Sequence, residues 1–115
     1  MILIPARNEG PRIGAVLEQV AVALPGVPVV VIVNGCTDDT EAVAIQAGAT
    51  VIHSEPGYGA ALRAGYRYAL GFDDVDWTVQ LDADGQHPAS EIPRLIQALE
   101  RADVVIGSRF VKGGE

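Results

Sequence analysis

The sequence predicts an α/β protein, with a mostly parallel sheet between two layers of helices. Short apolar runs rich in Val and Ile alternate along the chain with segments whose apolar residues recur at helical spacing. The run Val29–Val33 is apolar throughout, as is typical of a parallel strand covered on both faces. Such alternation with right-handed crossovers builds a three-layer α/β/α, Rossmann-like sheet.

The expected strands are short and apolar. They cover residues 1–4, 29–33, 50–53, 77–81 and 103–106. In open sheets of this kind, ligands bind at the carboxyl ends of the strands, near the point where the strand order switches. The polar clusters of this chain follow strands directly, so we expect the site at that edge.

The first two helices follow the first two strands. The first has one apolar face and ends before Pro25. The second is expected to begin with Thr37 as its N-cap and to stop at Gly48. Asp38 and Asp39 would then lie in its first turn, where the helix dipole favours negative charge.

The later helices complete one domain, residues 1–115. The segment 59–70 predicts a helix rich in small residues, and 92–99 carries apolar residues on one face. We find no repeat, low-complexity tract or linker between the elements. One domain must therefore account for the whole function.

Composition limits the classes of function. The formal net charge is −7 and the eight Lys and Arg are scattered, so nucleic acid and anionic membranes are disfavoured partners. No apolar run approaches the roughly 18 residues that cross a bilayer. The single Cys36 excludes an internal disulfide, and the start of the chain lacks a secretion signal pattern. A cytoplasmic location is expected.

Asp82 and Asp84 follow the strand 77–81. On an extended backbone, residues i and i+2 point to the same side, so both carboxylates meet at the end of the strand. Mg²⁺ or Mn²⁺ held by one or two carboxylates usually completes its shell with water and substrate phosphates. The pair therefore predicts a metal site for a diphosphate. A simple turn at Asp84-Gly85, followed by a helix start, is the alternative.

Five motifs occur in a specific order. They are PARNEG (5–10), NGCTDDT (34–40), GYGAALRAG (57–65), DAD (82–84) and VIGSRFVKGG (105–114). In this order they resemble the N-terminal, nucleotide-sugar-binding half of a family-two glycosyltransferase with the GT-A fold. The polyprenyl-phosphate (dolichyl-phosphate) mannosyl- and glucosyltransferases are the similar branch. The resemblance covers essentially all 115 residues.

The resemblance implies a nucleoside site in the first two loops. Pro5, Arg7 and Glu9 would lie beside the nucleoside, where the Glu9 carboxylate accepts hydrogen bonds from ribose or base. A helix first-turn acid is the alternative for Glu9. Asn34 falls where the family usually has an Asp that meets the base edge, and an amide both donates and accepts, so uracil and guanine both stay open. Cys36 is expected to be a small turn residue.

Three residues are assigned to phosphates by the same resemblance. Gly59 would let backbone amides approach a phosphate at a helix N-terminus. Arg63 could reach a phosphate, and an arginine on the solvated helix face is the alternative. Arg109 suits phosphate recognition through its bidentate guanidinium, near the donor diphosphate or the acceptor phosphate.

The resemblance also assigns the metal ligands. Asp82, Asp84 and Gln86 would share Mg²⁺ or Mn²⁺, with Asp84 the direct, catalytic ligand. Asp82 and the adjacent Ala83 would lie nearer the ribose or donor sugar. For His87, a capping role before Pro88 is favoured over metal binding.

The implied reaction is transfer of a sugar from a UDP- or GDP-hexose with inversion. The metal would offset charge on the departing diphosphate. A polyprenyl phosphate acceptor is already ionised and needs no general base, whereas a hydroxyl acceptor does. The family places such a base beyond the last residue of this chain. A phosphate acceptor of this kind would bring the protein to the inner face of the membrane.

The chain is expected to be half of a catalytic domain. The family places a later antiparallel strand between the strand 77–81 and the strand at 104–106, and that strand is absent. An unfilled sheet position leaves backbone groups unpaired, which predicts a homodimer or other self-association.

Two other classes of protein stay open. A nucleotide-sugar or metal-binding module without catalysis would carry the same motifs. A receiver-like signalling domain would have the same length and alternation, but it would need an acidic pair after the first strand. A sugar nucleotidyltransferase is disfavoured, because its Gly-rich, Arg-containing loop after the first strand is missing.

Overall fold

The computed structural model describes residues 1–75, 77–83, 90 and 92–99. Four strands are seen there: β1 (Ile2–Ala6), β2 (Val29–Val33), β3 (Thr50–His53) and β4 (Val79–Gln80). The helices are α1 (Gly10–Ala23), α2 (Thr40–Gln46), α3 (Tyr58–Leu70) and α4 (Ile92–Leu99). Strand and helix alternate in the order that the sequence predicts.

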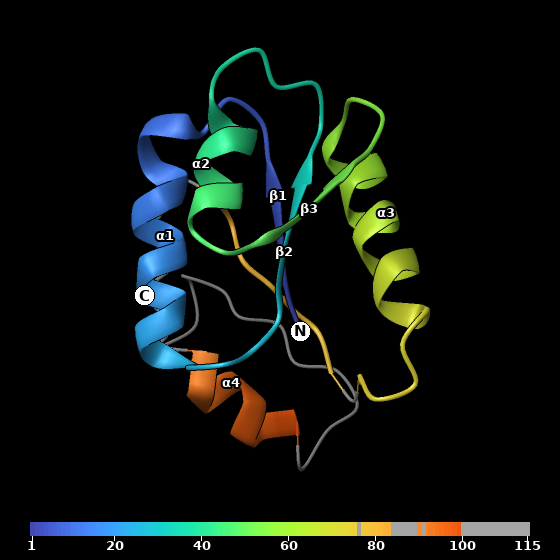
Figure 1. Cartoon of the computed structure of the whole chain (residues 1–115). Helices are drawn as coiled ribbons and strands as arrows, with labels where there is room; N and C mark the ends of the chain where they lie inside the picture. Colours follow the sequence, from blue (N-terminus) through green and yellow to red (C-terminus); the bar gives the residue numbers. More distant parts are fainter. Residues whose placement is uncertain (76, 84–89, 91, 100–115) are drawn as a thin grey trace.

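The described strands form one parallel sheet in the order β3-β2-β1-β4. The order runs outward from β1 in both directions, so the strand order switches beside β1. Helices α1 and α2 cover one face of the sheet and α3 covers the other (Figure 1). The expected three-layer α/β arrangement is confirmed.

Alternation along the strands builds a core on each face. Ile2 and Ile4 of β1 belong to the cluster that includes Ile13 of α1. Leu3 of β1 and Ile32 of β2 belong to the cluster under α3, and all five side chains are fully buried. Because neighbouring residues of a strand point to opposite faces, a continuous apolar run is needed to serve both layers.

The first and fourth strands differ from their predicted ranges. β1 extends to Ala6, because it pairs with β2 along its whole length, up to Val33. β4 is shorter than 77–81, since its pairing with β1 covers Val79 and Gln80. The Leu81 N–H still donates to the carbonyl oxygen of Leu3 at 3.0 Å. The predicted strand 103–106 lies outside the described residues.

The start of α2 corrects a prediction. The helix begins at Thr40 with Asp39 as N-cap, so Thr37 is not the N-cap and Asp38 precedes the first turn. The Asp38 carboxylate accepts the Thr40 N–H at 3.0 Å and, from another segment, the Gly10 N–H at 3.0 Å. These bonds hold the segment that precedes α2 against the start of α1.

Candidate functional site

A pocket of about 350 Å³ opens at the carboxyl edge of the sheet. Its walls come from the ends of β1 and β2, the start of α3 and the end of β4. The lining residues are Pro5, Arg7, Glu9, Asn34, Gly57, Tyr58, Asp82 and Ala83. The pocket therefore lies where the strand order switches, the usual ligand position in an open α/β sheet.

Most described candidates from the sequence meet at this pocket. The residues that do so are Pro5, Arg7, Glu9, Asn34, Asp82 and Ala83. They come from three segments far apart in the chain, and the parallel pairing of β1 with both β2 and β4 brings those segments together. Their roles toward a ligand stay predictions.

The third loop contributes two residues to the pocket. Gly57 and Tyr58 line the pocket, whereas Gly59 and Arg63 are not among its lining residues. Arg63 is exposed, and its Nη1 atom would lie 3.5 Å from a Cβ at Gly59. Gly57 has φ +116°, a backbone conformation that glycine adopts readily. The glycine before the helix was the signal that could have identified Tyr58.

Asn34 places a polar side chain in the wall. It is 5% exposed, and its Oδ1 atom has no hydrogen-bond partner in the described part of the chain. Its backbone N–H donates to the Ala6 carbonyl oxygen at 3.2 Å, which fixes the residue between β1 and β2. A buried, unpaired amide oxygen costs free energy. It is suited to accept a hydrogen bond from a ligand in this pocket.

Glu9 lies at the mouth of the pocket and is the N-cap of α1. Its carboxylate does not cap the helix but accepts a hydrogen bond from Arg12 Nε at 2.7 Å. The side chain is 20% exposed, against 58% for Arg12. The ion pair holds the Glu9 side chain at the pocket, where one carboxylate oxygen can serve a ligand.

Tyr58 connects α3 with the end of β4. Its hydroxyl donates a hydrogen bond to the Asp82 carboxylate and accepts one from Gln80 Nε2. Partial burial and, second, the negative charge of Asp82 raise the pKa of Tyr58 above its ordinary value of 10.0. The phenol therefore stays protonated at neutral pH and is available as a donor beside the carboxylate.

The donor chemistry at the end of β4 fits a hard cation. Asp82 supplies carboxylate oxygens to the pocket, and Mg²⁺ or Mn²⁺ takes oxygen ligands from one or two carboxylates with waters and phosphates. In the described ranges no group of three or more His, Cys, Asp or Glu side chains gathers. The candidates Asp84, Gln86, His87 and Arg109 lie outside those ranges.

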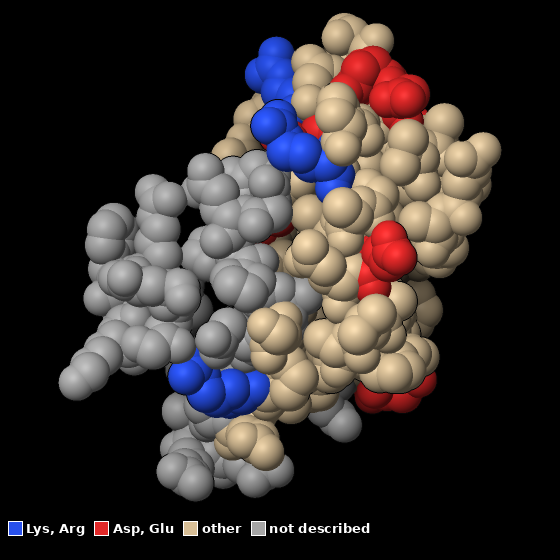
Figure 2. Space-filling view, turned by 90° about the vertical axis from the view of Figure 1, so that its left-hand side faces the viewer, with Lys and Arg blue, Asp and Glu red and all other residues tan. Residues whose placement is uncertain are grey.

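Charge on the described surface is mixed. The face drawn in Figure 2 carries basic side chains in separate groups, with acidic side chains near them, and shows no continuous basic stripe among the described residues. Among the helices that the structure describes, none is long and apolar enough to span a bilayer.

The parallel sheet and the polar pocket at its carboxyl edge are those of an open α/β fold, in which ligands bind where the strand order switches. The chain belongs to glycosyl transferase family 2, whose family model matches residues 1–115. The predicted family is thus confirmed, and a receiver-like signalling domain is set aside.

Two curated relatives are about a third identical to the chain over the aligned residues. The polyprenol monophosphomannose synthase of Mycolicibacterium smegmatis is 35% identical over 99% of this chain and 46% of its own length. The undecaprenyl-phosphate mannosyltransferase of Micrococcus luteus is 36% identical over 100% of this chain and 50% of its own. The chain spans about half the length of these relatives.

Solved structures support the GT-A fold. Glucosyl-3-phosphoglycerate synthase of Mycobacterium tuberculosis, in complex with Mn²⁺, UDP and glucosyl-3-phosphoglycerate, superposes with a TM-score of 0.69 at 28% identity. The match covers 85% of this chain and 38% of that one. The same enzyme with Mg²⁺ and UDP gives a TM-score of 0.68.

Proposed function

We propose that the pocket binds the nucleoside diphosphate part of a UDP- or GDP-hexose, as the donor half of a glycosyltransferase. The observation that carries this is the pocket itself. It unites the first loop, the second loop and the first aspartate of the Asp-x-Asp motif at one edge of the sheet. The UDP complexes of the structural neighbours support the assignment.

The nucleoside would lie between the first two loops. The buried Oδ1 of Asn34 would accept a hydrogen bond from the base, which relieves its unpaired state. The Glu9 carboxylate, already fixed by Arg12, would accept from ribose or base. The exposed Arg7 at the rim would add positive charge near the diphosphate.

The diphosphate would lie toward the end of β4, where Asp82, with Asp84 and Gln86 from the sequence motif, would hold Mg²⁺ or Mn²⁺. When bound, the cation neutralises charge that develops on the leaving diphosphate. Tyr58 holds the Asp82 carboxylate in one orientation. Arg109 is proposed to contact a phosphate of donor or acceptor.

The proposed acceptor is a polyprenyl phosphate, and transfer inverts the anomeric carbon. The mannosyltransferase relatives act on lipid phosphates by their names, which supports this choice over a hydroxyl acceptor. An ionised phosphate oxygen attacks without a general base. The reaction would take place at the inner face of the membrane, and self-association remains a prediction.

A transfer assay tests the proposal. The chain is incubated with Mn²⁺, a short polyprenyl phosphate and radiolabelled GDP-mannose or UDP-glucose, and the organic phase is counted. Labelled lipid that disappears in Asp84→Asn is the expected result. Donor binding without transfer of label would favour the other candidate, a nucleotide-sugar-binding module without catalysis.

A further inference from the structure

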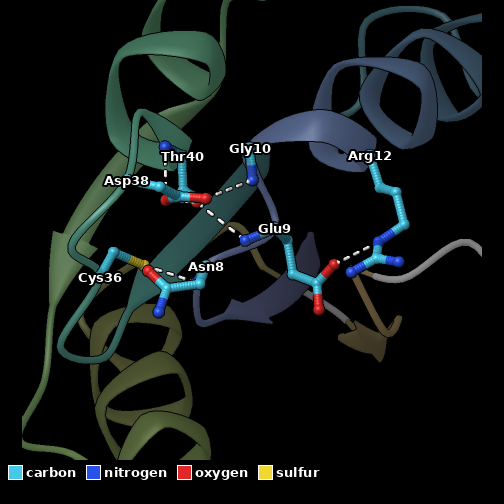
Figure 3. A network of polar contacts seen from close by, with 7 residues as sticks. All are labelled: Asn8, Glu9, Gly10, Arg12, Cys36, Asp38 and Thr40. Atoms are coloured by element: carbon cyan, nitrogen blue, oxygen red, sulfur yellow. Dashed lines mark hydrogen bonds and ion pairs between the residues drawn. The ribbon is translucent and has the colours of Figure 1, made fainter.

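The first two loops of the pocket are fastened to each other by side chains outside the pocket lining. Figure 3 shows the network, in which residues after β1 meet residues after β2. It contains Asn8, Glu9 and Gly10 on one loop and Cys36, Asp38 and Thr40 on the other, together with Arg12. Asp38 and Thr40 have no part in the roles assigned above.

Asp38 joins the starts of two helices. One carboxylate oxygen, Oδ2, accepts the N–H of Gly10 at 3.0 Å, at the first residue of α1. The other, Oδ1, accepts both the N–H of Thr40 at 3.0 Å and the Thr40 hydroxyl. The first N–H groups of a helix lack partners within the helix, so one carboxylate satisfies α1 and α2 together.

Thr40 extends this contact to Glu9. Its hydroxyl is fully buried and is oriented by donating to Asp38. The Thr40 Oγ1 atom then accepts the backbone N–H of Glu9 at 2.9 Å. Glu9 is therefore fixed at its backbone by Thr40 and at its carboxylate by Arg12.

The residue before Glu9 is held by the same loop. Asn8 has φ +52°, a left-handed conformation that asparagine tolerates better than most residues. Its Oδ1 accepts the Thr37 N–H at 2.8 Å, and its own N–H donates to Cys36 Sγ at 3.3 Å. The first loop is thus shaped by the second before any ligand arrives.

We propose that Asp38, acting through Thr40, is a positioning residue that presets Glu9 for the nucleoside of the donor. The inference rests on the proposed function, because it assigns Glu9 to that nucleoside. A loop fixed in advance loses less conformational entropy when the ligand binds. Asp38 itself touches no ligand. Because it works through Glu9, its loss should lower the affinity for the nucleoside and leave the affinity for the diphosphate unchanged.

Asp38→Asn tests this with the shape of the side chain kept. An amide presents a single acceptor oxygen, so either Gly10 or Thr40 faces an NH₂ group. Asp73→Asn is the matched control: it makes the same change of charge at an exposed residue that follows α3 and is not part of the network in Figure 3. Calorimetry at about 10 °C on variants shown to be folded by circular dichroism measures UDP, GDP and pyrophosphate binding with Mn²⁺.

The expected result is a loss of about tenfold in nucleoside diphosphate affinity for Asp38→Asn, on the scale of one charge-assisted hydrogen bond. Pyrophosphate affinity of Asp38→Asn and all affinities of the Asp73→Asn control stay at the wild-type values. If Asp38→Asn binds UDP and GDP as tightly as wild type does, the inference is overturned and the proposed function still stands. A wild type that binds no nucleoside diphosphate overturns the proposed function, and the inference falls with it.

A pair at Thr40 covers the case in which Asp38→Asn does not fold. Thr40→Val removes the hydroxyl at nearly constant shape, whereas Thr40→Ser keeps it. We expect Thr40→Val to lose nucleoside diphosphate affinity and Thr40→Ser to retain most of it. Equal affinity in both variants contradicts the relay to Glu9.

Discussion

The hydroxyl of Tyr58, the first residue of α3, donates a hydrogen bond to the carboxylate of Asp82 beyond the end of β4. Two elements that meet at the pocket are thereby joined by one side chain. Gln80, two residues before Asp82 and on the same side of the strand, donates to the same hydroxyl. Helix α3 thus contacts Asp82, the proposed metal ligand, through Tyr58.

Replacing Tyr58 by Phe is expected to weaken Mn²⁺ binding in the presence of UDP or GDP. The Asp82 carboxylate loses the donor that orients it, and loss of such a partner typically costs about 10- to 100-fold in metal affinity. Electron paramagnetic resonance of free Mn²⁺ measures the effect. Tyr68→Phe removes a hydroxyl from a partly buried tyrosine of α3 that packs on the exposed Phe72, and its Mn²⁺ affinity should equal that of wild type.

Asn34→Ala is expected to weaken nucleoside diphosphate binding while it changes the stability of the fold little. The Asn34 Oδ1 atom has no hydrogen-bond partner in the described residues, so its removal should change the free energy of unfolding by less than about 1 kcal/mol. Nucleoside diphosphate affinity should fall about tenfold, as for one lost hydrogen bond. Urea denaturation and calorimetry give the two values. A large loss of stability with unchanged affinity would make Asn34 a structural residue.

The decrease in the free energy of unfolding at acid pH should depend in part on Asp38. The hydrogen bond from the Thr40 hydroxyl first, and backbone N–H groups with it, lower the pKa of Asp38 below its ordinary value of 3.8. A lowered folded-state pKa means that the stabilisation is present above pH 3.8 and is lost as the pH falls through the lowered pKa.

The gap in unfolding free energy between wild type and Asp38→Asn should therefore be largest above pH 3.8 and should shrink as the pH falls through the lowered pKa of Asp38. Urea melts at several pH values measure it, with Asp73→Asn as the control. A gap that does not change with pH would show that the Asp38 carboxylate is not held by these bonds.

Gly65 is expected to tolerate no large side chain. A Cβ there would lie 3.1 Å from Ile32 Cδ1 and 3.4 Å from Leu3 Cδ1, because α3 packs closely on the sheet. Gly65→Val should cost about 1–3 kcal/mol, the usual range for overpacking. Ile32→Val removes the closer methyl group, so the double variant should be more stable than the sum of the single changes predicts. Additive free energies of unfolding would contradict the close approach.

Much of this architecture could be predicted from the sequence. The run Val29–Val33 gave a strand with the observed bounds, because β-branched residues and burial on both faces leave little choice. Pro5, Asn34 and Asp82 could be brought to one site in advance, since parallel strands end at the same edge. The order of the five motifs also predicted the family.

Other features depend on contacts between distant residues. Thr37 had the properties of an N-cap, but its hydroxyl and its N–H both donate to Asn8 Oδ1, and the helix begins at Thr40. A local pattern contains no information on such a bond. Tyr58 was likewise missed as a site residue, because its role comes from Asp82, which lies far along the chain.

The central claim is a metal-dependent donor site at the edge of the sheet. Calorimetric titration of UDP and GDP into the chain, with and without Mn²⁺, on wild type, Asp82→Asn and Asp84→Asn, tests it most directly. We expect Mn²⁺-dependent binding of one nucleotide, greatly weakened in both variants. Binding of neither nucleotide, or equal binding without Mn²⁺ and in both variants, would contradict it.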